Sequence, residues 1–234
     1  MTVPQILLLA LLLLSLGLLL YWLLVTTEGA FLGRRVVVWL YDVTAPYYDE
    51  IKEFDEKEEW YLVTRPALLA LADAGDEPLV LDVACGTGRV ADALLNAPSF
   101  KGYLVGLDGS ERMLALARKK LSAHKDRFEL HHHEAVPLPF EDNRFDLVTC
   151  LETLEFLPDA GAALREMVRV LRPGGSLMTT RRRGWEARAF LNRYYSREGL
   201  EQFLVSLGLE QVHTQRWQVA YDLVQGVKAP SHEK

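Results

Sequence analysis

Residues 79–90 have the sequence LVLDVACGTGRV, in which an apolar run stops abruptly at Gly86-Thr87-Gly88. Such a run, followed by a glycine turn and then by residues with helical spacing, predicts a buried strand, a tight turn and a helix. Gly86 and Gly88 can adopt backbone angles that other residues avoid, and the first N–H groups of a helix have no partner within it. The stretch therefore predicts a cradle in which a small molecule lies against the main chain.

The residue that separates the possible ligands of this cradle is Asp82. Together with Ala91 the turn satisfies the dinucleotide pattern G-x-G-x-x-G/A, so the glycines alone do not identify a ligand. Asp82 lies four residues before Gly86, where a carboxylate repels a pyrophosphate but attracts the cationic amino group of S-adenosylmethionine (SAM). SAM is therefore favoured over a nucleotide, and a turn with only a structural role is the third interpretation.

Size and composition limit the classes of protein to which the chain can belong. It has 234 residues, of which 50% are hydrophobic, and a formal net charge of −6. That length suits one α/β domain with an appendage rather than two full domains. The negative charge argues against nucleic-acid binding, which needs a broad excess of Lys and Arg. Two cysteines make neither a disulfide framework nor a zinc site, and they suit a reducing compartment.

The chain begins with an uncharged, leucine-rich run over residues 6–25. About twenty such residues are what a helix needs to cross the hydrocarbon core of a bilayer, and Tyr21 and Trp22 near its end suit the interface. A cleaved signal peptide is the alternative, but no Lys or Arg precedes the run and no A-x-A site follows it. Residues 1–28 are therefore expected to form a transmembrane anchor.

The next segment, residues 29–65, is expected to hold juxtamembrane and lid helices. Arg34 and Arg35 are the nearest cations beyond the span, so the positive-inside tendency makes this a single-pass protein with its remaining chain in the cytoplasm. Residues 36–41 form a second apolar stretch that is too short to cross a bilayer. The sequence leaves two places open for this stretch, either along the bilayer surface or at the start of the globular domain.

Further buried strands alternate with helical segments after the glycine turn, which predicts a parallel sheet. Residues 102–108 form an apolar strand that ends in Asp108. Ligands of such sheets bind beyond the carboxyl ends of the strands, so Asp108 is placed to accept two hydrogen bonds from a ribose diol. Residues 127–135 are expected to hold a third strand and the turn beyond it, residues 145–150 a fourth strand, and residues 171–178 the turn into a fifth. A closing antiparallel hairpin is expected over 212–217 and 219–227.

Three successive histidines, residues 131–133, lie in the third of these strands. Adjacent side chains in a strand point to opposite faces, so the three imidazoles cannot converge on one ion. No metal site is predicted.

Several ordered motifs carry a family resemblance. The acid-x-x-x-Gly-x-Gly order at residues 82–88 is joined by Glu-Ala-Val-Pro-Leu-Pro-Phe at 134–140, by Phe-Asp-Leu-Val at 145–148 and by Arg-Pro-Gly-Gly at 172–175. Together they resemble the class I SAM-dependent methyltransferases, in particular the methyltransferase type 11 branch, which includes quinone-biosynthesis and phospholipid N-methyltransferases. The resemblance covers residues 41–180 well, and the hydrophobic span lies outside the family pattern.

The resemblance implies a Rossmann-like, doubly wound and mostly parallel sheet of seven strands with an antiparallel C-terminal strand, formed by residues 66–228 and followed by a polar tail, 229–234. It implies SAM as cofactor, and it implies a set of cofactor-binding residues. These are Tyr47, Asp82, Ala84, Cys85, Gly86, Gly88, Asp108, Gly109, Glu134, Ala135 and Leu151.

Some of these positions depart from the family pattern, and one of them is a choice between two neighbouring tyrosines. Tyr47 and Tyr48 are both candidates for a lid tyrosine that closes over the cofactor. Glu134 stands where relatives carry an aspartate that approaches the adenine amino group. Many relatives carry Glu-His where this chain has Glu155-Phe156, which removes the histidine that could act as a base. Glu155 is then the nearest candidate base, with a structural or substrate-orienting role as the alternative.

The expected function is methyl transfer from SAM to a small-molecule acceptor by a membrane-tethered enzyme. A lipid or quinone that enters from the bilayer is the leading acceptor, and a soluble metabolite is the alternative. A membrane-anchored SAM-binding or scaffold protein without catalysis and a nucleotide-dependent oxidoreductase are the other candidate functions. The cluster formed by Arg181, Arg182 and Arg183 is either a solvated turn or a contact for acidic lipid headgroups.

Overall fold

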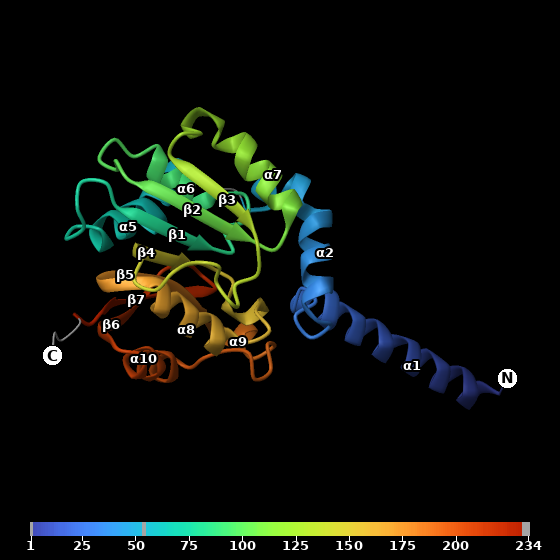
Figure 1. Cartoon of the computed structure of the whole chain (residues 1–234). Coiled ribbons are helices and arrows are strands. Elements are labelled where there is room, and N and C mark those ends of the chain that lie inside the picture. The colour runs from blue at the N-terminus through green and yellow to red at the C-terminus, as the bar shows by residue number, and fades with distance from the viewer. Residues whose placement is uncertain (1, 53–54, 231–234) are drawn as a thin grey trace.

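The computed structural model describes residues 2–52 and 55–230, and they include a seven-stranded sheet with the order β3-β2-β1-β4-β5-β7-β6 (Figure 1). The strands are β1 (Leu79–Val83), β2 (Tyr103–Asp108), β3 (Phe128–His132), β4 (Phe145–Cys150), β5 (Leu171–Arg182), β6 (Leu209–Arg216) and β7 (Tyr221–Lys228).

The sheet is mixed in the way the sequence predicts. Strands β1 to β5 are parallel to one another, whereas β7 pairs antiparallel with both β5 and β6. The expected mostly parallel sheet and its antiparallel C-terminal strand are therefore confirmed. The third strand lies within the expected range, and the hairpin strands begin at Leu209 and Tyr221 instead of residues 212 and 219.

Helices cover both faces of the sheet. Their bounds are α5 (Arg65–Ala70), α6 (Arg89–Leu95), α7 (Glu111–Lys120), α8 (Ala160–Val170), α9 (Gly184–Ala187) and α10 (Arg197–Ser206). Alternation along β1 sends Leu81 into a core with α8 and α10, and Val80 into a core with α5 and α6. Both cores are apolar, and they hold the strands in place.

Two family-motif residues hold the start of β1. Asp146, in the Phe-Asp-Leu-Val motif, accepts a hydrogen bond from the backbone N–H of Leu79 at 2.7 Å. Its other oxygen pairs with Arg172 of the Arg-Pro-Gly-Gly motif at 2.6 Å. These motif residues therefore fix the register of β1, β4 and β5 and lie at the edge opposite the glycine turn.

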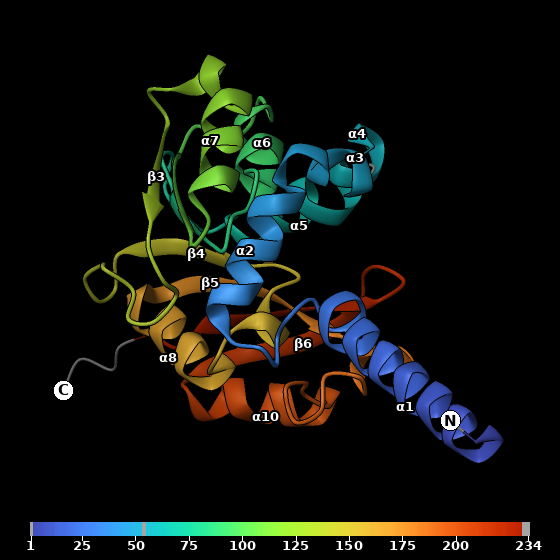
Figure 2. The ribbon, with the colours of Figure 1, turned by 90° about the vertical axis from the view of Figure 1, so that its right-hand side faces the viewer.

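The N-terminal helix extends away from the domain (Figures 1 and 2). It consists of α1 (Val3–Tyr21) and a π-helical turn (Trp22–Thr26), and together they form one helix long and apolar enough to cross a membrane, with none of it buried in the protein. Nearly every leucine along α1 is exposed, so this helix contributes nothing to the core of the domain.

The segment between α1 and the sheet packs against the domain. It holds α2 (Arg34–Thr44), a 3-10 turn (Ala45–Tyr47), α3 (Tyr48–Lys52), α4 (Glu56–Glu59) and a π-helical turn (Trp60–Thr64). Helix α2 packs against α7, and the two helices lie close together in Figures 1 and 2. Of the two places that the sequence leaves open for residues 36–41, the structure therefore favours the start of the globular domain.

Candidate active site

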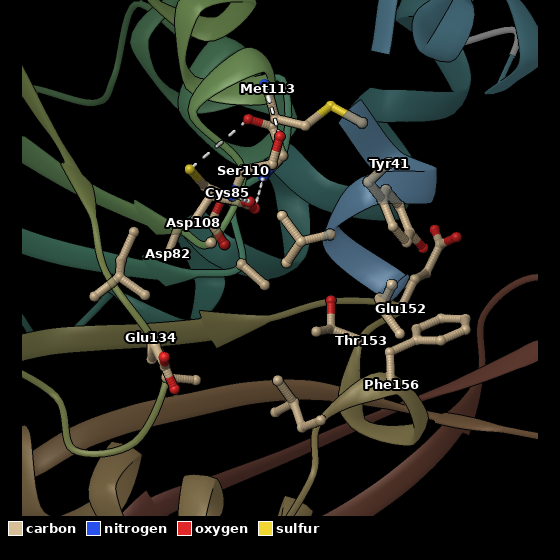
Figure 3. Close-up of a pocket in the computed structure, with 18 of the residues that line it drawn as sticks. Tyr41, Asp82, Cys85, Asp108, Ser110, Met113, Glu134, Glu152, Thr153 and Phe156 are labelled. Carbon is tan, nitrogen blue, oxygen red and sulfur yellow. Dashed lines mark hydrogen bonds between the residues drawn. The ribbon is translucent and has the colours of Figure 1, made fainter. Parts of the chain in front are cut away.

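A cavity of about 340 Å³ opens beyond the carboxyl ends of β1, β2 and β4 (Figure 3). Its walls come from three parts of the chain: helix α2 with Tyr48, the loops after β1 and β2, and the loops after β3 and β4. This is the place at which ligands of open α/β sheets bind.

Most of the predicted cofactor residues line this cavity. They are Asp82, Ala84, Cys85, Gly86, Asp108, Gly109, Glu134, Ala135 and Leu151. The sequence positions of these residues span about seventy residues, so their convergence comes from the parallel topology, which stacks the ends of successive strands side by side.

Tyr47 and Gly88 lie elsewhere. Tyr47 is 62% exposed and is absent from the cavity lining, whereas the neighbouring Tyr48 contributes to it. Of the two lid candidates, the structure therefore brings Tyr48 to the cavity. Gly88 has φ +82° at the start of α6, and a Cβ there would lie 3.2 Å from the side chain of Leu121. Gly88 thus allows α6 to pack close to α7 rather than forming the cavity wall.

Asp82 is the most deeply buried acid of the cavity lining, with 3% of its surface exposed. Thr149 donates a hydrogen bond to its Oδ1 at 2.6 Å. Burial raises the pKa of Asp82 to about 7; the hydrogen bond from Thr149 opposes this shift and the charge of Asp108 adds to it. A cationic ligand group would restore the ionised form, because an opposite charge at short range stabilises a carboxylate.

Asp108 holds the glycine turn in place. It accepts a hydrogen bond on Oδ2 from the backbone N–H of Gly86 and another on Oδ1 from that of Ser110, both at 2.8 Å. Burial raises the pKa of Asp108, while these two backbone donors act in the opposite direction. The carboxylate is therefore oriented at the cavity wall before any ligand arrives.

The glycine turn leaves open space toward the cavity. Gly86 has φ +53°, and a Cβ built on it would meet no other atom within 4 Å. Ala84, two residues before Gly86, also has a positive φ, +58°, a conformation that residues other than glycine rarely adopt. Backbone strain of this kind concentrates at functional sites.

Several lining residues come from helix α2, for which the sequence predicts only a juxtamembrane or lid helix. They are Arg34, Val37, Val38 and Tyr41. The sequence analysis assigns Arg34 to membrane orientation and gives Tyr41 no role in the site. The available signal was the amphipathic spacing of the three apolar residues, at 37, 38 and 41, which lie on one side of a helix.

Glu152 is a further lining residue that sequence reasoning missed. It has φ +54°, and its side chain pairs with Lys52 and Arg89, each at 2.6 Å. Burial by itself would raise the pKa of Glu152, but the two cations hold that pKa below its usual value. Arg89 also pairs with Glu59 at 2.6 Å, so this network ties the lid helices to the start of α6.

Glu155, the candidate base, lies outside the cavity lining. It is 1% exposed, accepts a hydrogen bond from the Tyr221 hydroxyl at 2.6 Å, and lies 3.6 Å from the guanidinium of Arg182. Burial raises the pKa of Glu155, and its contacts with Tyr221 and Arg182 oppose that shift. Of the two roles left open by the sequence, this position favours the structural one.

We expect Glu155→Ala to destabilise the protein more than it slows methyl transfer. The change removes the acceptor of a buried tyrosine hydroxyl and a counter-charge of Arg182, which should lower the free energy of unfolding by roughly 2–4 kcal/mol. Glu155→Gln keeps an acceptor and is expected to lose less. Thermal unfolding and turnover of both variants check this; a large fall in turnover for Glu155→Gln at full stability would restore the base assignment.

The basic cluster is occupied by contacts within the domain. Arg181 and Arg183 pair with Asp222 at 2.7 and 3.4 Å. The guanidinium of Arg182 lies over the rings of Phe190 and Tyr221. These arginines therefore join β5 to β7 and to the segment after α9.

Comparisons with known proteins agree with this geometry. Residues 81–179 match the methyltransferase domain model Methyltransf_11. Demethylmenaquinone methyltransferase of Lactiplantibacillus plantarum is 38% identical over 144 residues, which cover 59% of this chain and 59% of that protein. The chain thus matches less than two thirds of the length of that curated relative.

Similar solved structures share the fold. The [4+2]-cyclase SpnF superimposes with a TM-score of 0.64 at 20% identity, covering 83% of this chain and 96% of the cyclase. Phosphoethanolamine N-methyltransferase 2 of Haemonchus contortus, solved with S-adenosylhomocysteine, gives a TM-score of 0.59 at 18% identity, covering 71% of this chain and 52% of that one.

The matched domain model, the identity to a curated methyltransferase and the strand order lead to one family. The carboxylates at the ends of β1 and β2 and the glycine turn between them lie where the motif order of that family predicts them. Residues 81–179 therefore form a methyltransferase domain of the class I, SAM-dependent type.

Proposed function

We propose that this protein transfers the methyl group of SAM to a lipophilic small molecule, such as a quinone or another lipid, that reaches the cavity from a membrane. The proposal divides the chain into an anchor (1–28), juxtamembrane and lid helices (29–65), a catalytic domain (66–228) and a tail (229–234). The observation that carries it is one cavity with a charged end and an apolar end.

The charged end fits a cationic adenosine cofactor. Asp82 is a buried carboxylate with a raised pKa and no cationic side chain at hydrogen-bond distance among the described residues, so it would gain from a cationic ligand group. The open space at Gly86 admits a ligand against the main chain, and Asp108 offers its carboxylate next to that turn. We infer that Ala84, Cys85, Gly109, Glu134, Ala135 and Leu151 complete this end.

SAM supplies a methyl group that the sulfonium charge already activates, so transfer is an in-line displacement that depends on alignment. The residues of this chain then need to orient the two reactants and exclude water. Tyr41 and Tyr48 are suited to this role because both line the cavity, and burial raises the pKa of each hydroxyl well above its usual range. Both phenols therefore stay neutral and uncharged at physiological pH.

The apolar end fits a lipophilic acceptor. Val37, Phe156, Leu157 and Pro158 line it, and the same loop also contributes Glu152, whose charge is offset by Lys52 and Arg89. Phe156 and Val37 also belong to an apolar cluster with Ala30, Phe31 and Phe190, which lies at the foot of the hydrophobic helix α1. This continuity supports an acceptor path that begins at the membrane surface.

The anchor would act by concentrating the enzyme at that surface. Helix α1 and the following π-helical turn are long and apolar enough to span a bilayer, and the first cations beyond them are Arg34 and Arg35. We infer a single-pass orientation with the domain in the cytoplasm, where SAM is available. Tethering raises the effective concentration of a membrane-dissolved acceptor without any new contact.

Labelling with methyl-labelled SAM tests the acceptor. Native membranes that contain the full chain are incubated with the labelled cofactor, and lipid extract and aqueous metabolites are counted separately, with Asp82→Ala as the control. We expect label in the lipid extract that disappears in the variant. Label only in the aqueous fraction would contradict the lipophilic acceptor.

A non-catalytic SAM-binding role is the second candidate. It is favoured by Phe156, which stands where many relatives have a histidine. Calorimetry combined with a methyl-transfer assay separates the two, because binding without turnover across broad acceptors would support this role. A nucleotide-dependent oxidoreductase predicts instead that NAD binding survives Asp82→Ala.

A further inference from the structure

The first residue of α2 reaches the cofactor end of the cavity. Arg34 pairs through Nη1 with Oε1 of Glu134 at 2.7 Å, and both side chains are partly exposed. Its Nη2 lies close to Gly109, since a Cβ built on that glycine would be 3.4 Å away. A residue that precedes the matched methyltransferase domain by 47 positions therefore forms part of this wall.

Glu134 is held next to the end of β2, which carries Asp108. The preceding residue, His133, donates its backbone N–H to the carbonyl of Asp108 at 3.1 Å, which fixes the loop after β3 against the end of β2. The ion pair with Arg34 uses Oε1 of Glu134. Oε2 is then left to accept a hydrogen bond from a ligand, in an orientation that the guanidinium sets.

The far end of α2 is fixed to the loop after β2. Ser110 donates its hydroxyl to Oδ1 of Asp42 at 2.5 Å, and Arg112 donates to the carbonyl oxygen of the same residue at 3.2 Å. The backbone N–H of Ser110 in turn binds Asp108. Helix α2 is therefore held at both ends against loops that shape the cofactor site, with Val38 between them in the lining.

The use of glutamate in place of the family's aspartate at position 134 follows from this arrangement. A glutamate side chain is one methylene longer than that of aspartate, so it can reach Arg34 of α2 with one oxygen and still present the other to the cavity.

We propose that Arg34 is a positioning residue for the cofactor: it holds Glu134 so that Oε2 accepts a hydrogen bond from the exocyclic amino group of adenine. This proposal rests on the proposed function in that the ligand carries adenosine. It makes the membrane-proximal helix a working part of the cofactor site, and it makes adenine recognition depend on a segment adjoining the anchor.

Binding of two ligands by the full chain tests the proposal. S-adenosylhomocysteine is compared with its hypoxanthine analogue, S-inosylhomocysteine, in which a carbonyl replaces the amino group that Glu134 would accept from. The ratio of the two dissociation constants reports adenine recognition, which a purely structural role of Arg34 would leave unchanged.

We expect Arg34→Ala to weaken S-adenosylhomocysteine binding about 3- to 10-fold and to lower the adenine preference by a similar factor, since an exposed ion pair has a modest effect. Arg34→Lys keeps a charge and should recover part of both. Glu134→Gln should lower the adenine preference, and the double variant Arg34→Ala/Glu134→Gln should show little further loss of that preference. Arg35→Ala is the matched control, because Arg35 is exposed on the same helix and is absent from the lining.

An unchanged adenine preference in Arg34→Ala, with binding that still depends on Asp82, would overturn the role of Arg34 and leave the proposed function standing. Equal losses in Arg35→Ala would also overturn it, because a general charge effect would then explain the result. Failure of the unsubstituted chain to bind S-adenosylhomocysteine would overturn both the role of Arg34 and the proposed function.

Discussion

Asp82→Asn should weaken SAM binding by roughly 10- to 100-fold, the effect expected from removing one partner of a buried, charge-assisted hydrogen bond. The variant keeps an oxygen that can accept from Thr149, which in the protein donates to Asp82 at 2.6 Å. The loss therefore reports the missing negative charge rather than a disrupted pocket. Calorimetric titration of both proteins measures it, and equal affinities would remove Asp82 from the site.

The same acid predicts a pH dependence of binding. Because burial raises the pKa of Asp82 to about 7, a proton must leave the carboxylate before a cationic group can pair with it. SAM affinity should fall by roughly 20- to 30-fold between pH 7.5 and pH 5.5 if the bound form stays ionised. Asp82→Asn should make SAM affinity nearly independent of pH in this range. If the affinity of the variant still falls at low pH, another group causes the dependence.

The stability of the ligand-free protein should change in the opposite direction. A carboxyl group whose folded-state pKa lies above its unfolded value favours folding below the unfolded pKa, near 4, and that contribution is lost as the pH rises through about 7. Asp82→Asn should therefore raise the free energy of unfolding at pH 8 by on the order of 2–4 kcal/mol and have little effect near pH 4. Thermal unfolding at the two pH values checks this sign.

Gly86→Val should abolish measurable SAM binding, a loss of at least about 100-fold. Gly86 has φ +53°, which a β-branched residue adopts only with strain, and the new side chain would point into the space left for the ligand. The strain would also displace the backbone N–H of residue 86, which donates a hydrogen bond to Asp108.

Gly208→Val is the matched control for this change. Gly208 also has a positive φ, +88°, and open space at its Cβ position, but it follows α10 and is absent from the cavity lining. We expect both variants to lose stability to a similar extent and only Gly86→Val to lose binding. If both variants lost binding to a similar extent, backbone strain and not the filling of the space at Gly86 would explain the loss.

The core of the fold follows from local sequence signals. The apolar run before Gly86 and the apolar run that ends in Asp108 each form a strand, because a strand buried on both faces is continuously apolar and has few alternatives. The parallel topology then brings both acids to one edge of the sheet, so that this half of the site could be predicted without coordinates.

Residues set by tertiary packing could not be found in this way. Tyr47 and Tyr48 are adjacent and chemically equal in sequence, and only the path of the chain through the 3-10 turn brings Tyr48 to the cavity. Glu155 follows the fourth strand like a site residue, yet it packs under Tyr221 of a strand more than sixty positions away. Arg34 belongs to no sequence motif. It meets its partner Glu134, which is far away in the sequence, only in the folded protein.

Titration of the full chain with SAM, S-adenosylhomocysteine and NAD⁺ in parallel tests the central claim most directly. A buried carboxylate ahead of an open glycine turn predicts saturable binding of the two amino-acid-bearing adenosine compounds and none of the diphosphate. Binding of NAD⁺ with no response to SAM or S-adenosylhomocysteine would contradict the account.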